Sequence, residues 1–199
     1  MTKEKSQIAI LGWGSLLWEP GDDFGNWIER WNLDGPSLHI EFSRISGTRD
    51  GALTLVLDAK NGTPATVAWC FSKRAQLEDA IADLRCREST NLANIGHISL
   101  SEKPSPPNDL EKAIIDWATE KRLDAVVWTA LKSNFEEKVK KPFSTGNAIA
   151  YIRNLSVGGK VKAAEYVWKA PEFVRTPLRS ALQGEPWFSE AAPTPEKRQ

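Results

Sequence analysis

A chain of 199 residues and 22.2 kDa suits one domain with a full-sized core. Its 26 basic and 26 acidic residues cancel, so the chain lacks the net field that attracts nucleic acid or an anionic membrane. Two cysteines are too few for a disulfide framework or a structural zinc site, and no segment approaches the roughly 20 apolar residues of a membrane span. We therefore expect a cytoplasmic protein with no nucleic-acid or membrane partner.

The first half of the chain predicts mainly strands. Residues 7–12 are apolar and end at a glycine, which is typical of a short buried strand. Residues 37–46 alternate apolar and polar side chains, and this period of two places Glu41 on the polar face of a half-buried strand. The alternation returns in residues 52–59, and an Asn-Gly pair then favours a hairpin that leads into a strand over residues 65–72.

The second half predicts mainly helices. Apolar residues at helical spacing indicate an amphipathic helix over residues 75–88. Asn108 or Asp109 is a suitable cap for a following helix, and the pair Gly158-Gly159 is expected to end another. Two further strands and two further helices are predicted after residue 88, at 96–100, 110–122, 124–131 and 145–156.

The order of these elements argues for an α+β domain, because most strands precede most helices and hairpin-like turns join several of them. The predicted sheet is mixed or largely antiparallel and barrel-like. The segment around residues 162–187 reads as helix with a break at Pro171. We predict a single domain over residues 1–190 and a disordered tail over residues 191–199, which is rich in proline and charge.

Several well-known motifs are missing. Gly12 and Gly14 do not start a dinucleotide-binding fingerprint, because Leu17 stands where the third glycine belongs. The sequence has no Gly-Lys-Ser/Thr of a phosphate-binding loop and no Gly-x-Ser-x-Gly elbow. The only histidines, His39 and His97, are expected at the surface or at a rim. We therefore predict no metal and no cofactor.

Glu88 does not fit the amphipathic pattern of its helix. At about 100° per residue, Glu88 falls about 20° from Leu77 and so lies within the apolar stripe. The stripe consists of Leu77, Ile81 and Leu84. A carboxylate on a buried face tends to have a raised pKa and makes a plausible general acid or base. The alternative is that the chain leaves helical geometry before Glu88, which then faces water. Arg85 and Arg87 beside it either pair with it or meet an anionic substrate, and the alternative is that both are solvated.

The loop after the first strand, Gly12-Trp13-Gly14-Ser15, also allows two interpretations. Glycines let a ligand approach closely, and backbone N–H groups outside a strand ladder form a nest for a carboxylate or an oxyanion. The alternative is a tight turn with only a structural role.

Four segments together resemble the gamma-glutamyl cyclotransferase-like superfamily, including its ChaC-type glutathione-degrading branch. The segment GWGSLLW is similar to the YGSL-type loop of that family, and FSRISGTRDG, TVAWCFS and LRCRE follow in the family's order. The resemblance covers about residues 7–90, with a weaker echo in IAYIRNL. Trp13 stands where the family usually has a tyrosine.

The resemblance implies a small mixed barrel flanked by helices, and it assigns roles to particular residues. Gly14, Ser15 and Leu16 would be the loop that holds a gamma-glutamyl group, with Trp13 preceding it. Glu88 would be the catalytic acid/base, the residue that helical periodicity also singles out.

Arg44 and Arg49, near the second motif, are candidates for binding a substrate carboxylate. The reaction implied is attack of the substrate's own α-amine on its γ-carbonyl, which releases 5-oxoproline and an amine or amino acid without a cofactor. Two alternatives stay open. One is a non-catalytic module of the same fold that binds a small metabolite or a peptide end. The other is an amide hydrolase in which Glu88 activates water.

Overall fold

A computed structural model of the chain describes residues 6–102 and 106–190. The chain divides into two compact units, each built from segments far apart in sequence. Unit 1 comprises Met1–Gly12, Glu19–Leu38 and Thr66–Leu131, and unit 2 comprises Trp13–Trp18, His39–Ala65 and Lys132–Gln199. One domain over residues 1–190 stays a prediction, and the predicted disordered tail lies outside the described residues.

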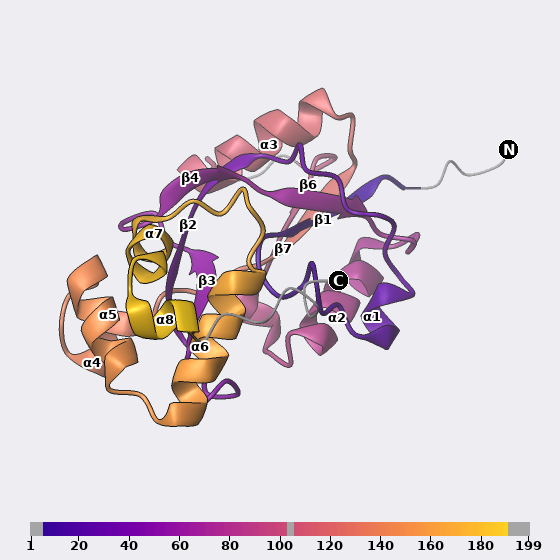
Figure 1. Ribbon diagram of the computed structural model, residues 1–199. Coiled ribbons are helices and arrows are strands. Elements are labelled where there is room, and N and C mark those ends of the chain that lie inside the picture. Colours follow the sequence, from indigo (N-terminus) through magenta and orange to yellow (C-terminus); the bar gives the residue numbers. More distant parts are fainter. Residues whose placement is uncertain (1–5, 103–105, 191–199) are drawn as a thin grey trace, which may run out of the picture. The chain divides into compact units, whose positions relative to one another are not determined.

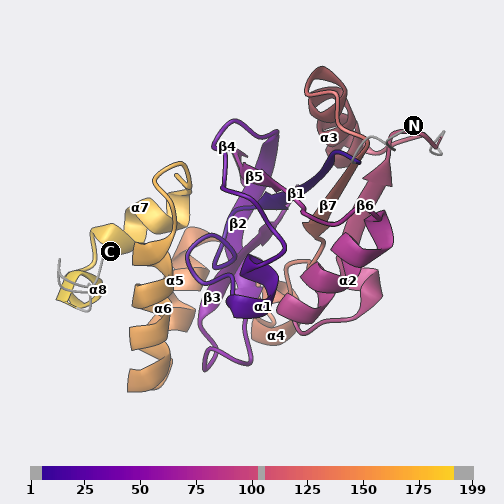
Figure 2. The same cartoon turned by 90° about the vertical axis from the view of Figure 1, so that its right-hand side faces the viewer.

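Unit 1 contains a mixed four-stranded sheet in the order β5-β1-β7-β6. The central strand β1 pairs antiparallel with β5 and parallel with β7, and β7 pairs antiparallel with β6. The strands are β1 (Ile8–Gly12), β5 (Ala68–Phe71), β6 (Ile95–Ser99) and β7 (Ala125–Thr129). Every residue of β1 is buried, because helices lie on both sides of the sheet: α3 on one side and α2 on the other (Figures 1 and 2).

Among its described residues, unit 1 has four helical elements, and the sequence predicts the two longer ones. The four elements are α1 (Asp22–Gly25), α2 (Leu77–Arg87), the 3-10 turn η1 (Leu92–Asn94) and α3 (Asp109–Glu120). Asn108 caps α3 in a capping box with Glu111, which confirms one of the two caps predicted for this helix. The apolar stripe of α2 is buried through Ile81 and Leu84, as its periodicity predicts.

The second sheet, most of which belongs to unit 2, has the order β3-β2-β4. Strands β2 and β3 pair antiparallel, and α6 packs on β3. The strands are β2 (Ser37–Ile45), β3 (Leu53–Leu57) and β4 (Thr63–Thr66). The helices are α4 (Phe135–Val139), α5 (Thr145–Arg153), α6 (Val157–Lys169), α7 (Pro177–Gln183) and α8 (Pro186–Glu190). The protein is therefore an α+β chain with two open sheets flanked by helices.

The predicted barrel does not form among the described strands, and the segment 65–72 shows why. The sequence predicts one strand there, whereas the structure divides it into β4 and β5, which belong to different sheets. At the division, Val67 donates its N–H to the Pro36 carbonyl and accepts from the Gly35 N–H, both at 3.1 Å. Gly35 permits this approach, because a Cβ there would lie 2.3 Å from the Val67 oxygen.

Gly158 and Gly159 do not end a helix as predicted. Helix α5 ends at Arg153, and α6 begins at Val157 and runs through both glycines. Ser156 caps α6 by accepting the Gly159 N–H at 3.1 Å. A Cβ on Gly159 would lie 2.7 Å from the Asp50 carbonyl oxygen, so this glycine serves a close contact between α6 and the loop before β3.

The helical regions near the end of the chain differ from the sequence prediction at α4 and agree with it at Pro171. Sequence reasoning missed α4, because five residues are too few to show helical periodicity. The predicted break at Pro171 is confirmed, since α6 ends at Lys169 and the next helix begins at Pro177.

No helix among the described residues combines the length and apolar character that crossing a bilayer requires.

Candidate functional site

The loop after β1 is a compact turn with buried side chains. Trp13 and Leu16 are each only 5% exposed, so the indole ring of Trp13 and the methyl groups of Leu16 are part of a core. The Leu17 N–H donates to the Gly14 carbonyl at 3.0 Å, which closes the turn. Ser15 is the partly exposed residue at its centre. A ligand would therefore meet this loop through its backbone and Ser15 rather than through Trp13.

Tyr166 on α6 explains why position 14 is a glycine. A Cβ on Gly14 would lie 2.6 Å from the Tyr166 hydroxyl oxygen. The tyrosine is 4% exposed, and its ring makes edge contacts with Trp18 and Phe42 at centroid distances of 5.3 and 6.2 Å. The loop is thus built around a phenol that comes from a helix in the last third of the chain.

Arg49 reaches the same tyrosine. Its guanidinium carbon lies 5.1 Å from the Tyr166 ring centroid, a distance typical of a cation–π contact. Residues 46–51, which carry Arg49, are fixed by two helices: the Tyr151 hydroxyl donates to the Gly51 carbonyl at 2.9 Å, and Lys162 pairs with Asp50 at 2.7 Å. The structure therefore brings Gly14 and Arg49 together through Tyr166.

Arg44, the other predicted carboxylate binder, has a different setting. It lies on β2, and its Nη1 donates to the Lys132 carbonyl at 2.7 Å. This bond fastens β2 to the segment that precedes α4, where Asn134 also accepts the Ile45 N–H at 2.7 Å. The contacts give Arg44 a structural role within unit 2.

Glu88 lies at the end of α2 in unit 1. Its N–H donates to the Leu84 carbonyl at 2.9 Å, so helical geometry continues to Glu88, and its side chain is 17% exposed. Arg87 donates to the Glu88 carboxylate at 3.1 Å and, through its other terminal nitrogen, to the Glu19 carbonyl at 2.7 Å. Glu88 is therefore on the largely buried side that periodicity predicts, next to an anchored arginine.

Glu41 is a buried carboxyl that the sequence places wrongly. The alternation of β2 predicts it on an exposed face, yet it is only 1% exposed. A bulge between Glu41 and Arg44 adds one residue to β2 and interrupts the alternation. The Thr176 hydroxyl and the Leu178 N–H, at the start of α7, hydrogen-bond the Glu41 carboxylate.

The surroundings of Glu41 change its acidity. Burial raises the pKa of Glu41 to about 7, and the charge of Asp58 adds to this effect, whereas hydrogen bonds to the carboxylate oppose it. The strongest of these bonds comes from the Phe42 N–H at 2.7 Å. Glu41 consequently titrates near neutral pH inside the core of unit 2.

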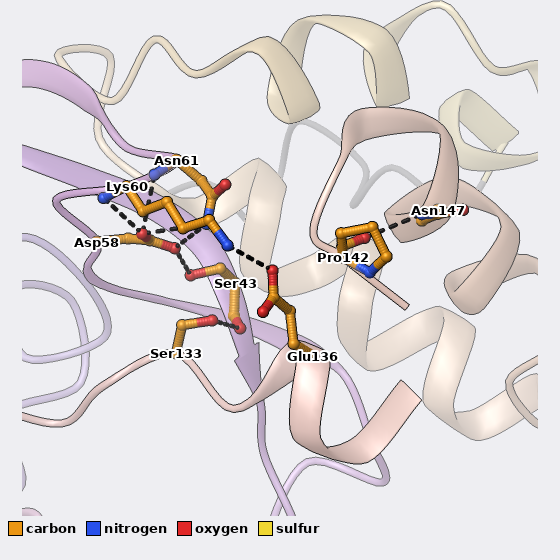
Figure 3. Close-up of polar contacts among 8 residues, drawn as sticks. All are labelled: Ser43, Asp58, Lys60, Asn61, Ser133, Glu136, Pro142 and Asn147. Atoms are coloured by element: carbon orange, nitrogen blue, oxygen red, sulfur yellow. Dashed lines mark hydrogen bonds and ion pairs between the residues drawn. The ribbon is translucent and has the colours of Figure 1, made fainter. Parts of the chain in front are cut away.

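Asp58, the second buried acid of this unit, is held by many donors (Figure 3). It accepts the Ser43 hydroxyl at 2.7 Å and the N–H groups of Lys60 and Asn61 at 3.1 and 2.9 Å. The Ser133 hydroxyl donates to the Ser43 carbonyl at 2.8 Å. These bonds stabilise the turn between β3 and β4 and assign Asp58 a structural role.

No sequence pattern pointed to Glu41 as a buried carboxyl, since neither the bulge nor the helix that covers it has a local signal.

The predicted site residues thus fall into two groups. Glu88 belongs to unit 1, and the others belong to unit 2: Trp13, Gly14, Ser15, Leu16, Arg44 and Arg49. His39 and His97 are exposed, as predicted. Among the residues that the structure describes, no group of three or more His, Cys, Asp or Glu side chains is arranged to hold a metal ion.

Comparison with protein-family models, with curated proteins and with solved structures gave no match to this chain.

Proposed function

We propose that this protein is a gamma-glutamyl cyclotransferase-like enzyme that converts a small gamma-glutamyl compound to 5-oxoproline and releases an amine or amino acid. One observation supports the proposal most. Glu88, which both helical periodicity and the resemblance single out, has a largely buried side chain next to an arginine anchored at 2.7 Å. A structural surface carboxylate has no need of such a setting. We also propose that the fold is of the gamma-glutamyl cyclotransferase-like type, in which a glycine loop follows the first strand and the catalytic carboxylate stands at the end of a helix.

The chemistry requires little beyond positioning and proton transfer. The Glu88 carboxylate takes a proton from the substrate's α-ammonium group, and the free amine attacks the γ-carbonyl carbon. Backbone N–H groups of Gly14–Leu16 stabilise the oxyanion that forms. The bond from the γ-carbon to the leaving nitrogen then breaks as Glu88 returns its proton to that nitrogen. The attacking nitrogen, which still carries two protons after the attack, releases one of them to water and becomes the N–H of the lactam. Because the nucleophile is tethered to the electrophile, positioning supplies much of the rate, and no step of this reaction requires a cofactor.

The proposal includes the cellular location of the substrates and the kinds of partner. Substrates would be small gamma-glutamyl compounds of the cytoplasm, with glutathione as one candidate, and the enzyme would act without nucleic-acid or membrane partners. Trp13 replaces the tyrosine of the resembling loop, and its side chain packs in a core rather than on an open surface.

Product identity tests the proposal. The purified protein is incubated with glutathione, with gamma-glutamyl dipeptides and with gamma-glutamylamines, and the products are separated by chromatography. We expect 5-oxoproline from at least one substrate class. Glutamate instead of 5-oxoproline would support the hydrolase alternative. Binding of these compounds without turnover would support the non-catalytic alternative, and either result would overturn the proposed reaction.

A further inference from the structure

Arg87 makes two hydrogen bonds that tie the candidate acid/base to a second segment of unit 1. Its Nη1 donates to the Glu88 carboxylate at 3.1 Å, and its Nη2 donates to the Glu19 carbonyl at 2.7 Å. The side chains of Arg87 and Glu88 are only 14% and 17% exposed, and all three residues belong to unit 1. The guanidinium therefore links the carboxylate to a main-chain anchor.

The backbone at the end of α2 is fixed as well. The Thr90 N–H donates to the Arg85 carbonyl at 3.3 Å. The Ser89 N–H donates to the Cys86 carbonyl at 3.0 Å, and the two bonds together form a Schellman motif. Ser89 has a φ of 46°, at the left-handed position where glycine is the usual residue. Glu88, directly before it, keeps right-handed dihedral angles of −81° and −3°, so it projects from a defined helix end.

The other charged groups around α2 are in a different setting from Arg87. The elements α1, η1, β6 and β7 pack against α2. The titratable side chains that these elements carry are all exposed: Asp22, Asp23 and His97. The side chains of Glu19 and Arg85 are exposed too. Solvent screens exposed charges, whereas Arg87 and Glu88 meet on a largely buried surface.

The proposed reaction makes two demands on Glu88 that the contact with Arg87 meets. Glu88 must be ionised when it takes a proton from the α-ammonium group, and a guanidinium in contact with a carboxylate favours its ionised form. Glu88 must also keep one orientation, because a misplacement of about 1 Å can cost roughly 100-fold in rate. A planar guanidinium held at a second point supplies this orientation, whereas a lysine ammonium acts as a point charge.

We propose that Arg87 is a positioning residue of the cyclisation, which holds the Glu88 carboxylate in one orientation and in its ionised form and is itself anchored by the Glu19 carbonyl. The inference rests on the proposed function for its reaction. Of the roles that the sequence leaves open for Arg87, it selects pairing with Glu88 over contact with an anionic substrate. Arg87 therefore affects kcat and its pH dependence rather than KM.

Steady-state kinetics of three variants, measured from pH 5 to pH 9, test the inference in the full-length protein. We expect Arg87→Gln to lower kcat at pH 7 roughly 10- to 100-fold, and to change KM less than about threefold. The acidic limb of its kcat profile should move up by about one pH unit. Arg87→Lys keeps the charge but not the planar fork, so the limb should stay in place while kcat falls roughly 10-fold. Arg85→Gln removes an exposed charge from the same helix and is the control, which should match wild type.

Two kinetic results would overturn the inference. A folded Arg87→Gln variant with the wild-type kcat and pH profile would show that Glu88 does not depend on this partner. A raised KM at unchanged kcat would make Arg87 a substrate-binding residue instead.

Titration of the Glu88 carboxyl group separates this inference from the proposed reaction. Glutamate side chains are labelled with carbon-13 for NMR, and Glu88→Gln identifies the Glu88 resonance. We expect the titration midpoint in Arg87→Gln to lie about one pH unit above that of wild type, and the midpoint in Arg85→Gln to be unchanged. If 5-oxoproline never forms but this pattern is found, the reaction is wrong and the hold of Arg87 on the carboxylate stands. If the midpoints coincide, the inference is wrong whether or not 5-oxoproline forms.

Circular dichroism establishes whether each variant folds. Should Arg87→Gln fail to fold, Arg87→Lys decides the positioning role. A lowered kcat with the acidic limb in its wild-type position supports that role, and the wild-type kcat in Arg87→Lys would overturn it.

Discussion

The buried carboxyl of Glu41 makes the stability of this protein depend on pH in a defined direction. In the folded protein its pKa is raised from 4.5 to about 7, chiefly by burial. Between these two values the folded state keeps a proton that the unfolded state has lost. The free energy of unfolding must therefore fall as pH rises through this window, and it must level off above about pH 7.

The size of the effect follows from the same pKa values. A rise in pKa from 4.5 to about 7 on folding corresponds to a loss of roughly 3 kcal/mol across the whole window. Between pH 5 and pH 8, the accessible part is roughly 2 to 3 kcal/mol. Ion-pairing hydrogen bonds lower the pKa values of Asp34, Glu136 and Glu185, so these groups are ionised in both states.

Urea denaturation at pH 5 and pH 8 measures this loss directly. Glu41→Gln resembles the protonated acid in size and hydrogen bonding, so it should remove most of the pH dependence and be more stable than wild type at pH 8. Glu137→Gln, an exposed position on α4, is the control and should keep the wild-type profile. The reasoning is refuted if wild type loses less than about 1 kcal/mol from pH 5 to 8, or if Glu41→Gln retains the wild-type slope.

Glycine substitutions give two further predictions, both measured by urea denaturation. Gly14→Ala should cost about 1–3 kcal/mol, because the new Cβ meets the Tyr166 hydroxyl. The double variant with Tyr166→Phe should recover most of that loss, and equal costs in both backgrounds would contradict the contact. Gly159→Ala should cost about 1–3 kcal/mol, because its Cβ would lie against the Asp50 carbonyl oxygen. Gly158→Ala, with its nearest atom at 3.7 Å, should be neutral or stabilising by up to about 1 kcal/mol. Similar losses at both positions would contradict this account.

Local patterns predicted the elements whose burial depends on their own sequence. The apolar run of β1 and the cap at Asn108 both appear where expected, since a buried central strand and a capping box are specified within a few residues. The division at Val67 was not predictable, because the hydrogen bonds that cause it come from Gly35 and Pro36. Propensity and alternation do not register such non-local pairing.

The candidate site shows the same limit. Periodicity alone located Glu88, because its burial follows from the face of α2 to which it belongs. Tyr166 gave no signal, since its role depends on α6 packing close to Gly14. Glu41 was predicted on an exposed face, whereas residues at the start of α7 hydrogen-bond its buried carboxylate. When the burial and contacts of a residue depend on distant segments of the chain, they can be found only from the structure.

The most direct test of the central claim compares 5-oxoproline formation by wild type, Glu88→Gln and Glu78→Gln. Glu78 is an exposed carboxylate on the same helix, so its variant controls for the loss of a negative charge from α2. If Glu88 transfers the protons of the cyclisation, its variant should lose roughly 100- to 10,000-fold in kcat, while Glu78→Gln keeps the wild-type rate. Wild-type kcat in a folded Glu88→Gln variant would contradict the account.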